Sequence, residues 1–261
     1  MAQAPSRDDM LLEQFRALAQ RYEISDYFAA KLRKLEGWEI VLILDDSGSM
    51  NTPIGQQSGG AFGKSQTRWG ELKQTVQIII DIASVMDKDG LDLYFLNRAT
   101  VMGVTSSEQV ANVFNAPPAG LTPTTPVLRH VLQAKKAVSA EKKVLIIIAT
   151  DGAPTNAQGE VDTAGLRHVL TTERDPNRVH VQFISCTDDD STVSYLNEWD
   201  RKIPSLDVVD DYLSEKAEIQ RKRGRDFQFS FGNYVVKALL GSIDPEFDSM
   251  DEGAKGCCTI L

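Results

Sequence analysis

Three oxygen-bearing side chains follow one apolar stretch near the start of the chain, and together they could bind a hard cation. The apolar residues 40–44 lead directly to Asp45, and Ser47 and Ser49 follow at alternate positions. Gly48 lets the backbone turn tightly, so that these side chains can converge on one point. Carboxylate and hydroxyl oxygens suit Mg²⁺ or Mn²⁺ and are poor ligands for zinc or copper. The spacing therefore predicts a magnesium-type site.

Two later stretches carry further oxygen donors. Thr122 lies in the turn 120–124, which precedes a helical pattern, and the apolar run 144–149 leads through Thr150 to Asp151. Short apolar runs rich in β-branched residues are typical of strands buried on both faces. Asp45 and Asp151 would then each follow a strand. In open α/β sheets ligands bind at the carboxyl ends of the strands, so we expect both carboxylates at one edge of the sheet.

In order and in context, these positions resemble the von Willebrand factor type A domains. The metal-ion-dependent adhesion site of that family reads D-x-S-x-S after the first strand, then a threonine in a middle loop, then an aspartate in T-D-G after a later strand. The resemblance covers about residues 37–242, and the matching positions are Asp45, Ser47, Ser49, Thr122 and Asp151. The competing interpretation is that buried strands end here in ordinary turn-forming residues.

The resemblance implies a ligand set and a mode of binding. Ser47, Ser49 and Thr122 would be direct ligands of one Mg²⁺ (or Mn²⁺), while Asp45 and Asp151 would act largely through water. An Asp or Glu carboxylate from a partner protein, of unknown identity, would fill the open coordination position. Family members also shift their last helix when affinity changes, and residues 234–240 occupy that place in this chain.

The remaining pattern predicts an α/β fold: a doubly wound, mostly parallel sheet with one antiparallel edge strand and helices on both faces, Rossmann-like in architecture. A tight hairpin over 91–104 supplies the antiparallel strand. The other expected strands are 39–44, 144–149, 179–184 and 206–209. The expected helices are 69–86, about 125–138, about 161–172, one ending before Gly224, and 234–240.

We divide the chain into an N-terminal helical extension (1–36), a von Willebrand factor type A domain (37–242), and an acidic linker with a C-terminal tail (243–261). The extension reads as two short helices with a break near Ser25. It either packs on the domain as a flap or serves as a partner-binding or autoinhibitory segment, and the sequence leaves both open.

Composition limits the function classes. The 261 residues carry a formal charge of −9, which argues against a nucleic-acid or anionic-membrane surface as the main function. Only three cysteines are present, so a disulfide scaffold is excluded and a reducing compartment is expected. The sequence shows no signal peptide and no apolar run of membrane-spanning length. We therefore expect a cytoplasmic protein.

The last residues add an expectation of lipid anchoring. Cys258–Leu261 fits the C-a-a-X pattern, and its terminal Leu261 predicts the geranylgeranyl form in a eukaryotic cell. One prenyl chain rarely anchors a protein stably, and the acidic linker cannot help on an anionic leaflet. Palmitoylation of Cys257 would supply the second signal.

Two other stretches imitate functional motifs. Residues 58–65 resemble a phosphate-binding P-loop, but the first position is serine and no strand leads into it, so we predict no nucleotide site. The acidic run 187–191 is interpreted as a helix N-cap, with a second metal or an acidic rim as the alternative. Cys186 before it is most simply a core thiol.

The function predicted from the sequence is a metal-dependent protein-binding module, not an enzyme, with no catalytic residues. The enzyme alternative is a Mg²⁺-dependent hydrolase with Asp45 as nucleophile, but Ser47 stands where its acid/base carboxylate is needed. A serine hydrolase would need a G-x-S-x-G elbow around Ser47, which is missing. The third reading is an accessory subunit of an ATP-driven complex, or a structural module that uses no metal.

Overall fold

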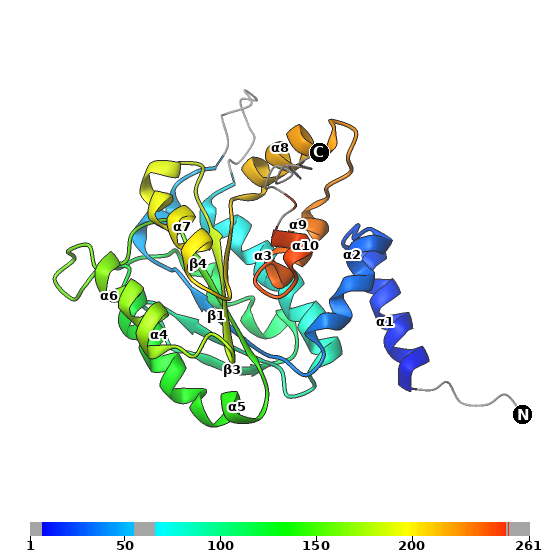
Figure 1. Cartoon of the computed structure of the whole chain (residues 1–261), viewed down its shortest axis with the longest axis horizontal. Coiled ribbons are helices and arrows are strands. Elements are labelled where there is room, and N and C mark those ends of the chain that lie inside the picture. Colours follow the sequence, from blue (N-terminus) through cyan, green and yellow to red (C-terminus); the bar gives the residue numbers. More distant parts are fainter. Residues whose placement is uncertain (1–6, 55–65, 249, 251–261) are drawn as a thin grey trace, which may run out of the picture.

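A six-stranded sheet runs through the computed structural model, which describes residues 7–54, 66–248 and 250 (Figure 1). Its strands are β1 (Glu39–Leu44), β2 (Leu91–Phe95), β3 (Val101–Val104), β4 (Val144–Thr150), β5 (Val179–Ser185) and β6 (Leu206–Val209). They lie in the order β3-β2-β1-β4-β5-β6, and only the edge strand β3 is antiparallel. The predicted doubly wound, mostly parallel sheet is confirmed.

The strand order places the predicted site at the reversal point of the sheet. The chain moves from β1 to β2 on one side and later returns to place β4 on the other side of β1. Leu44 at the end of β1 is level with Ala149 of β4, and the amide of Asp45 donates a hydrogen bond to the Ala149 carbonyl at 2.9 Å. In doubly wound sheets, ligands bind at the point where the strand order reverses.

Helices cover both faces of the sheet (Figure 1). One face carries α1 (Arg7–Arg21), α2 (Asp26–Lys31), α3 (Arg68–Met86), α8 (Tyr212–Arg223), α9 (Phe231–Leu240) and α10 (Pro245–Asp248). The other carries α4 (Thr124–Ala134), α5 (Lys136–Glu141), α6 (Thr163–His168) with the π-helical turn η5 (Val169–Glu173), and α7 (Asp190–Lys202). Short 3₁₀ turns are η1 (Leu32–Leu35), η2 (Gly48–Asn51), η3 (Ser107–Val110) and η4 (Val113–Asn115).

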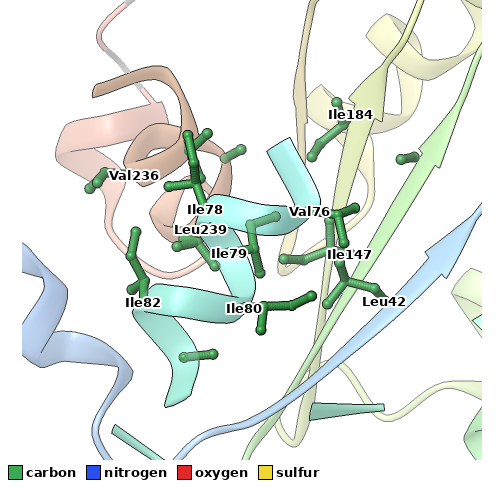
Figure 2. Close-up of a cluster of buried hydrophobic side chains, with 14 of the residues drawn as sticks. Leu42, Val76, Ile78, Ile79, Ile80, Ile82, Ile147, Ile184, Val236 and Leu239 are labelled. Carbon is green, nitrogen blue, oxygen red and sulfur yellow. The ribbon is translucent and has the colours of Figure 1, made fainter. Parts of the chain in front are cut away.

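Helix α3 is buried on two sides, between the sheet and α9. Figure 2 shows Val76 beside Leu42 and Ile147 of the central strands, while Ile78 lies on the side of Leu239 from α9. Val76 is completely buried and Ile78 almost so. Because apolar side chains on two sides of α3 are buried, packing sets the position of the helix and of the backbone at its first residue, Arg68.

The N-terminal helices pack on the same face as α3. The predicted break near Ser25 is confirmed: α1 ends at Arg21, and α2 begins at Asp26. The Ser25 amide donates to Asn233 Oδ1 at 2.8 Å, which joins this break to the start of α9. Phe28 is buried at 1% exposure within the core cluster that includes α3 and α9. The described part of the extension thus packs as a flap.

Two predicted helices differ from the observed ones. The segment 125–138 forms two helices, α4 and α5, which meet at Lys135. The Lys135 ammonium lies 2.5 Å from Glu39 and 2.6 Å from Asp92, two acids on the neighbouring strands β1 and β2, so the buried ion pairs fix the junction. The segment 161–172 begins as α6 and ends in a π-helical turn. The spacing of apolar residues in the sequence predicts neither the break between α4 and α5 nor the π-helical turn.

Candidate functional site

Asp45 lies at the carboxyl end of β1 and is fully buried. Its Oδ1 accepts a hydrogen bond from the Ser47 amide at 2.9 Å, and its Oδ2 accepts one from Thr150 Oγ1 at 2.7 Å. The first bond folds the chain back on itself after the strand, and the turn η2 follows at once. The second bond joins the loop after β1 to Thr150, the last residue of β4.

One of the predicted hydroxyl ligands, Ser49, contacts the second carboxylate directly. The hydroxyl oxygens of Ser47 and Ser49 lie 3.0 Å apart. Ser49 donates a hydrogen bond to Asp151 Oδ1 at 2.7 Å. Asp45, Ser47, Ser49 and Asp151, four of the five predicted ligands, therefore form one hydrogen-bonded cluster across the loops after β1 and β4. The side-chain atoms of this cluster that could bind a metal are all oxygens.

Thr122 reaches the cluster only through its loop. The Gly48 amide donates to the Gly120 carbonyl at 3.3 Å, which ties the turn η2 to the loop before α4. Asn97 Nδ2 donates to the Leu121 carbonyl at 2.8 Å. Thr122 itself is 8% exposed, and within the described residues no hydrogen bond joins its hydroxyl to the other four predicted ligands. The loop that carries Thr122 is therefore bonded to the turn η2, while the Thr122 hydroxyl is not part of the hydrogen-bonded cluster.

An arginine that sequence reasoning missed also binds the cluster. Arg68, the first residue of α3, places one guanidinium nitrogen 2.9 Å from Asp151 Oδ2. The other nitrogen donates to Thr187 Oγ1 at 2.6 Å and lies 4.0 Å from Asp188. A cation in the first turn of a helix is unfavourable, because it lies at the positive end of the helix dipole. The position of Arg68 at the start of α3 was therefore the one feature of the sequence that could have indicated an acidic partner elsewhere in the fold.

Asp46, the neighbour of Asp45, belongs to a different cluster. Its Oδ1 accepts hydrogen bonds from the amide of Asn97 at 2.8 Å and from Asn97 Nδ2 at 3.1 Å. Its Oδ2 lies 3.0 Å from Nε of Arg98. Arg98 also donates to the carbonyls of Val113, Ala116 and Pro117. We call Asp46, Asn97 and Arg98 the loop clamp, because they fasten the segment that leads to Thr122.

The electrostatics of the cluster favour a bound cation. Burial raises the pKa of Asp45 to about 6, against the lowering effect of hydrogen bonds from Ser47 and Thr150, and the charge of Asp151 raises it further. The cluster holds two buried carboxylates, and the guanidinium of Arg68 pairs with only one of them, Asp151, which leaves negative charge in the site. The donor set fits Mg²⁺ or Mn²⁺, which prefer oxygen ligands. Within the described residues no group of three His, Cys, Asp or Glu side chains could hold a metal, so a metal here would depend on the hydroxyls.

The other sequence predictions have simple outcomes. In the acidic run 187–191, Asp189 is the N-cap of α7 and accepts from the Ser191 amide at 3.1 Å, which confirms the capping interpretation. Cys186 is buried, and burial raises the pKa of its thiol, as expected of a core thiol. The P-loop-like stretch 58–65 and the tail cysteines Cys257 and Cys258 lie outside the described residues.

Comparisons with known proteins add no family. A scan against protein-family models and a search of curated proteins both gave no match. In the part of the chain that the structure describes, none of the helices combines the length and the apolar character needed to cross a bilayer.

Proposed function

We propose that this chain is a von Willebrand factor type A-like module that binds a partner protein through a Mg²⁺-type ion at the carboxyl ends of β1 and β4. The observation that carries the proposal is the contact between the two loops. Ser47 and Ser49 lie 3.0 Å apart, and Ser49 binds Asp151, at the reversal point of a doubly wound sheet. Ligands of such sheets bind at this point.

The residues divide into two roles. Ser47, Ser49 and Thr122 would hold the ion through neutral hydroxyls, while Asp45 and Asp151 would balance its charge from the buried side of the site. Because neutral ligands cancel little of its charge, the bound ion would supply an electrophilic position for an Asp or Glu carboxylate of the partner. Asp45 is held for its role by the Ser47 amide and by the Thr150 hydroxyl.

The contacts of Asp45 speak against the hydrolase alternative. A carboxylate nucleophile needs an accessible oxygen and a neighbouring acid/base group. Both oxygens of Asp45 accept hydrogen bonds at 2.9 and 2.7 Å, and its side chain is fully buried. Turnover of generic phosphate esters by the purified protein would support the hydrolase and contradict a pure binding function.

The test of the binding function is a pull-down with and without EDTA. We expect the partner to be released by EDTA and to return with Mg²⁺ or Mn²⁺. Ser47→Ala and Thr122→Ala should abolish capture, although neither removes a charge. Thr171→Ala, an exposed hydroxyl in η5, is the control and should bind normally. Capture that persists in EDTA would defeat the metal-dependent mechanism, and identification of the retained protein would show whether an ATP-driven complex is involved.

We also propose that the module is held at a cytoplasmic membrane face by a geranylgeranyl group on Cys258 and a palmitoyl group on Cys257. The support is the Cys-Thr-Ile-Leu sequence at 258–261. In a eukaryotic cell Cys258→Ser should move the protein from membrane to cytosol, and Cys257→Ser should weaken its retention. Mass spectrometry that finds the cellular protein unmodified at Cys258 would rule out prenylation.

A further inference from the structure

Arg68 occupies a place that the proposed metal site would contest. Its guanidinium donates to Asp151 Oδ2 at 2.9 Å, while Ser49 donates to Oδ1 of the same carboxylate. The Arg68 side chain is 11% exposed, and that of Asp151 is fully buried. Both oxygens of Asp151 are therefore engaged, one by the proposed metal ligand Ser49 and one by the positively charged guanidinium of Arg68.

A divalent cation at the two serines and Arg68 would repel each other. Like charges a few ångströms apart interact strongly where the surroundings exclude water, and both would draw on the same carboxylate. The Thr187 hydroxyl, which also binds Arg68, is neutral and cannot replace the lost carboxylate. Asp188 lies 4.0 Å from the Arg68 nitrogen that binds Thr187, but its side chain is more than half exposed to water, which weakens its attraction for Arg68. A cation-loaded site therefore leaves Arg68 without a buried anionic partner.

Glu71 is such a partner, one helical turn along α3. Residues three apart on a helix are neighbours, and an acid and a base at this spacing pair readily. Within the described residues Glu71 has no cationic partner, and its side chain accepts only a 3.5 Å hydrogen bond from the Tyr212 amide. Burial raises the pKa of Glu71 to about 7, with a further contribution from the negative charge of Asp211. It is a carboxylate that a cation would stabilise.

A small cavity connects the two side chains. Arg68, Glu71, Cys186 and Tyr234 line a space of about 10 Å³, which is close to the minimum for one water molecule. Nε of Arg68 is buried, and it has no hydrogen-bond partner in the part of the chain that the structure describes. The guanidinium thus borders a small space that also borders Glu71, and its Nε–H has no acceptor among the described residues.

We propose that Arg68 is a movable counter-ion, which holds Asp151 while the site lacks a divalent cation and pairs with Glu71 when the site binds one. This inference rests on the proposed metal-binding function. Because Glu71 contacts the start of α8 through Tyr212, and Tyr234 of α9 lines the same cavity, the pairing of Arg68 links the metal site to these two helices.

The first test measures metal affinity by isothermal titration of Mg²⁺ and Mn²⁺. Arg68→Gln keeps a hydrogen-bonding side chain but removes the competing charge, so affinity should rise about tenfold. Arg68→Lys should stay close to wild type. Arg129→Gln is the control, because it also removes an arginine that pairs with a carboxylate. Arg129 lies in α4, on the face of the sheet opposite α3, and contacts Glu173 at 2.6 Å. Unchanged or weaker binding by a folded Arg68→Gln protein would overturn the competition.

The second test is a double-mutant cycle between Arg68→Gln and Glu71→Gln, read by unfolding with and without saturating Mg²⁺. Without Mg²⁺, the effects of the two substitutions on the free energy of unfolding should add. With saturating Mg²⁺, the effect of one should depend on the presence of the other. Coupling that is the same in both conditions would overturn the exchange of partners. Wild type that takes up no metal would contradict the proposed function itself, whereas metal uptake with unaltered coupling would contradict this inference alone.

Discussion

Two arginine–aspartate pairs lie at the same edge of the sheet, and they differ in what else each aspartate holds. Asp46 accepts hydrogen bonds from Asn97 and lies 3.0 Å from Arg98, so all of its neighbours belong to the loop clamp. Asp151 is paired with Arg68 at 2.9 Å, but its other oxygen accepts from Ser49. One pair fastens a loop, and the other borders a cluster of potential metal ligands.

The difference shows why a carboxylate at a strand end is not by itself a metal ligand. Asp45 and Asp46 are consecutive and both fully buried. Successive side chains leave an extended chain in opposite directions, so one meets the loop after β4 while the other meets the loop after β2. Position in the sheet, and not residue type, separates the proposed metal ligand Asp45 from Asp46 of the loop clamp.

The largest expected effect separates the two aspartates by metal affinity. Asp151→Asn should weaken Mg²⁺ binding by more than about 100-fold, because it removes a charge from the ligand cluster. Asp46→Asn should change it only a few-fold, through the Thr122 loop. Isothermal titration of both folded variants checks this. Equal losses in the two would mean that the clamp and the site are not distinct.

For the free energy of unfolding we expect the opposite order, with Asp46→Asn the more damaging of the two substitutions. Asp46→Asn leaves the partly buried Arg98 without its carboxylate, and we expect a loss of about 2 kcal/mol in the free energy of unfolding. Asp151→Asn should cost less without metal, because it also relieves the repulsion that raises the pKa of Asp45. Urea unfolding in EDTA measures both. A larger loss for Asp151→Asn would show that Arg68–Asp151 is a structural pair.

The pH dependence of stability should reveal the carboxylate assigned to receive Arg68. The pKa of Glu71 is raised from 4.5 to about 7, so without metal the folded state holds a proton that the unfolded state has lost. Stability should therefore fall as the pH rises from about 4.5 to 7, by on the order of 2 kcal/mol from this group.

Other groups face Glu71, and they decide the control. Arg68 from its own helix, Asp211 at the start of α8, Cys186 after β5 and Tyr234 of α9 all surround it. Asp45, with a pKa raised to about 6, adds a slope of the same sign. Comparison of wild type with Glu71→Gln in EDTA isolates the contribution of Glu71. An identical slope in the two proteins would show that Glu71 titrates normally.

The smallest expected effect concerns the second anchor of Arg68. Thr187→Ala removes the hydroxyl that binds the guanidinium at 2.6 Å. Arg68 would then be held less firmly against Asp151, so Mg²⁺ affinity should rise about two- to threefold, in line with the loss of one hydrogen bond. A decrease in affinity, measured by the same titration, would indicate that Arg68 supports metal binding instead of opposing it.

The sequence predicted the sheet well because each strand is a short apolar run with a clear end. The hairpin that makes β3 antiparallel and the strand ends at Asp45 and Asp151 were visible in the same way. Arg68 was not, because its partners Asp151 and Thr187 come from distant strand ends that only the folded sheet brings together. The loop clamp was missed for the same reason: Asp46 pairs with residues after β2.

Anomalous diffraction from crystals grown with Mn²⁺ would locate the divalent cation that we propose among Asp45, Ser47, Ser49, Thr122 and Asp151. We predict one strong peak per chain within bonding distance of the Ser47, Ser49 and Thr122 hydroxyls, with Arg68 turned away from Asp151. A well-ordered site with no peak, and with Arg68 still bound to Asp151 in saturating Mn²⁺, would contradict the proposed metal site.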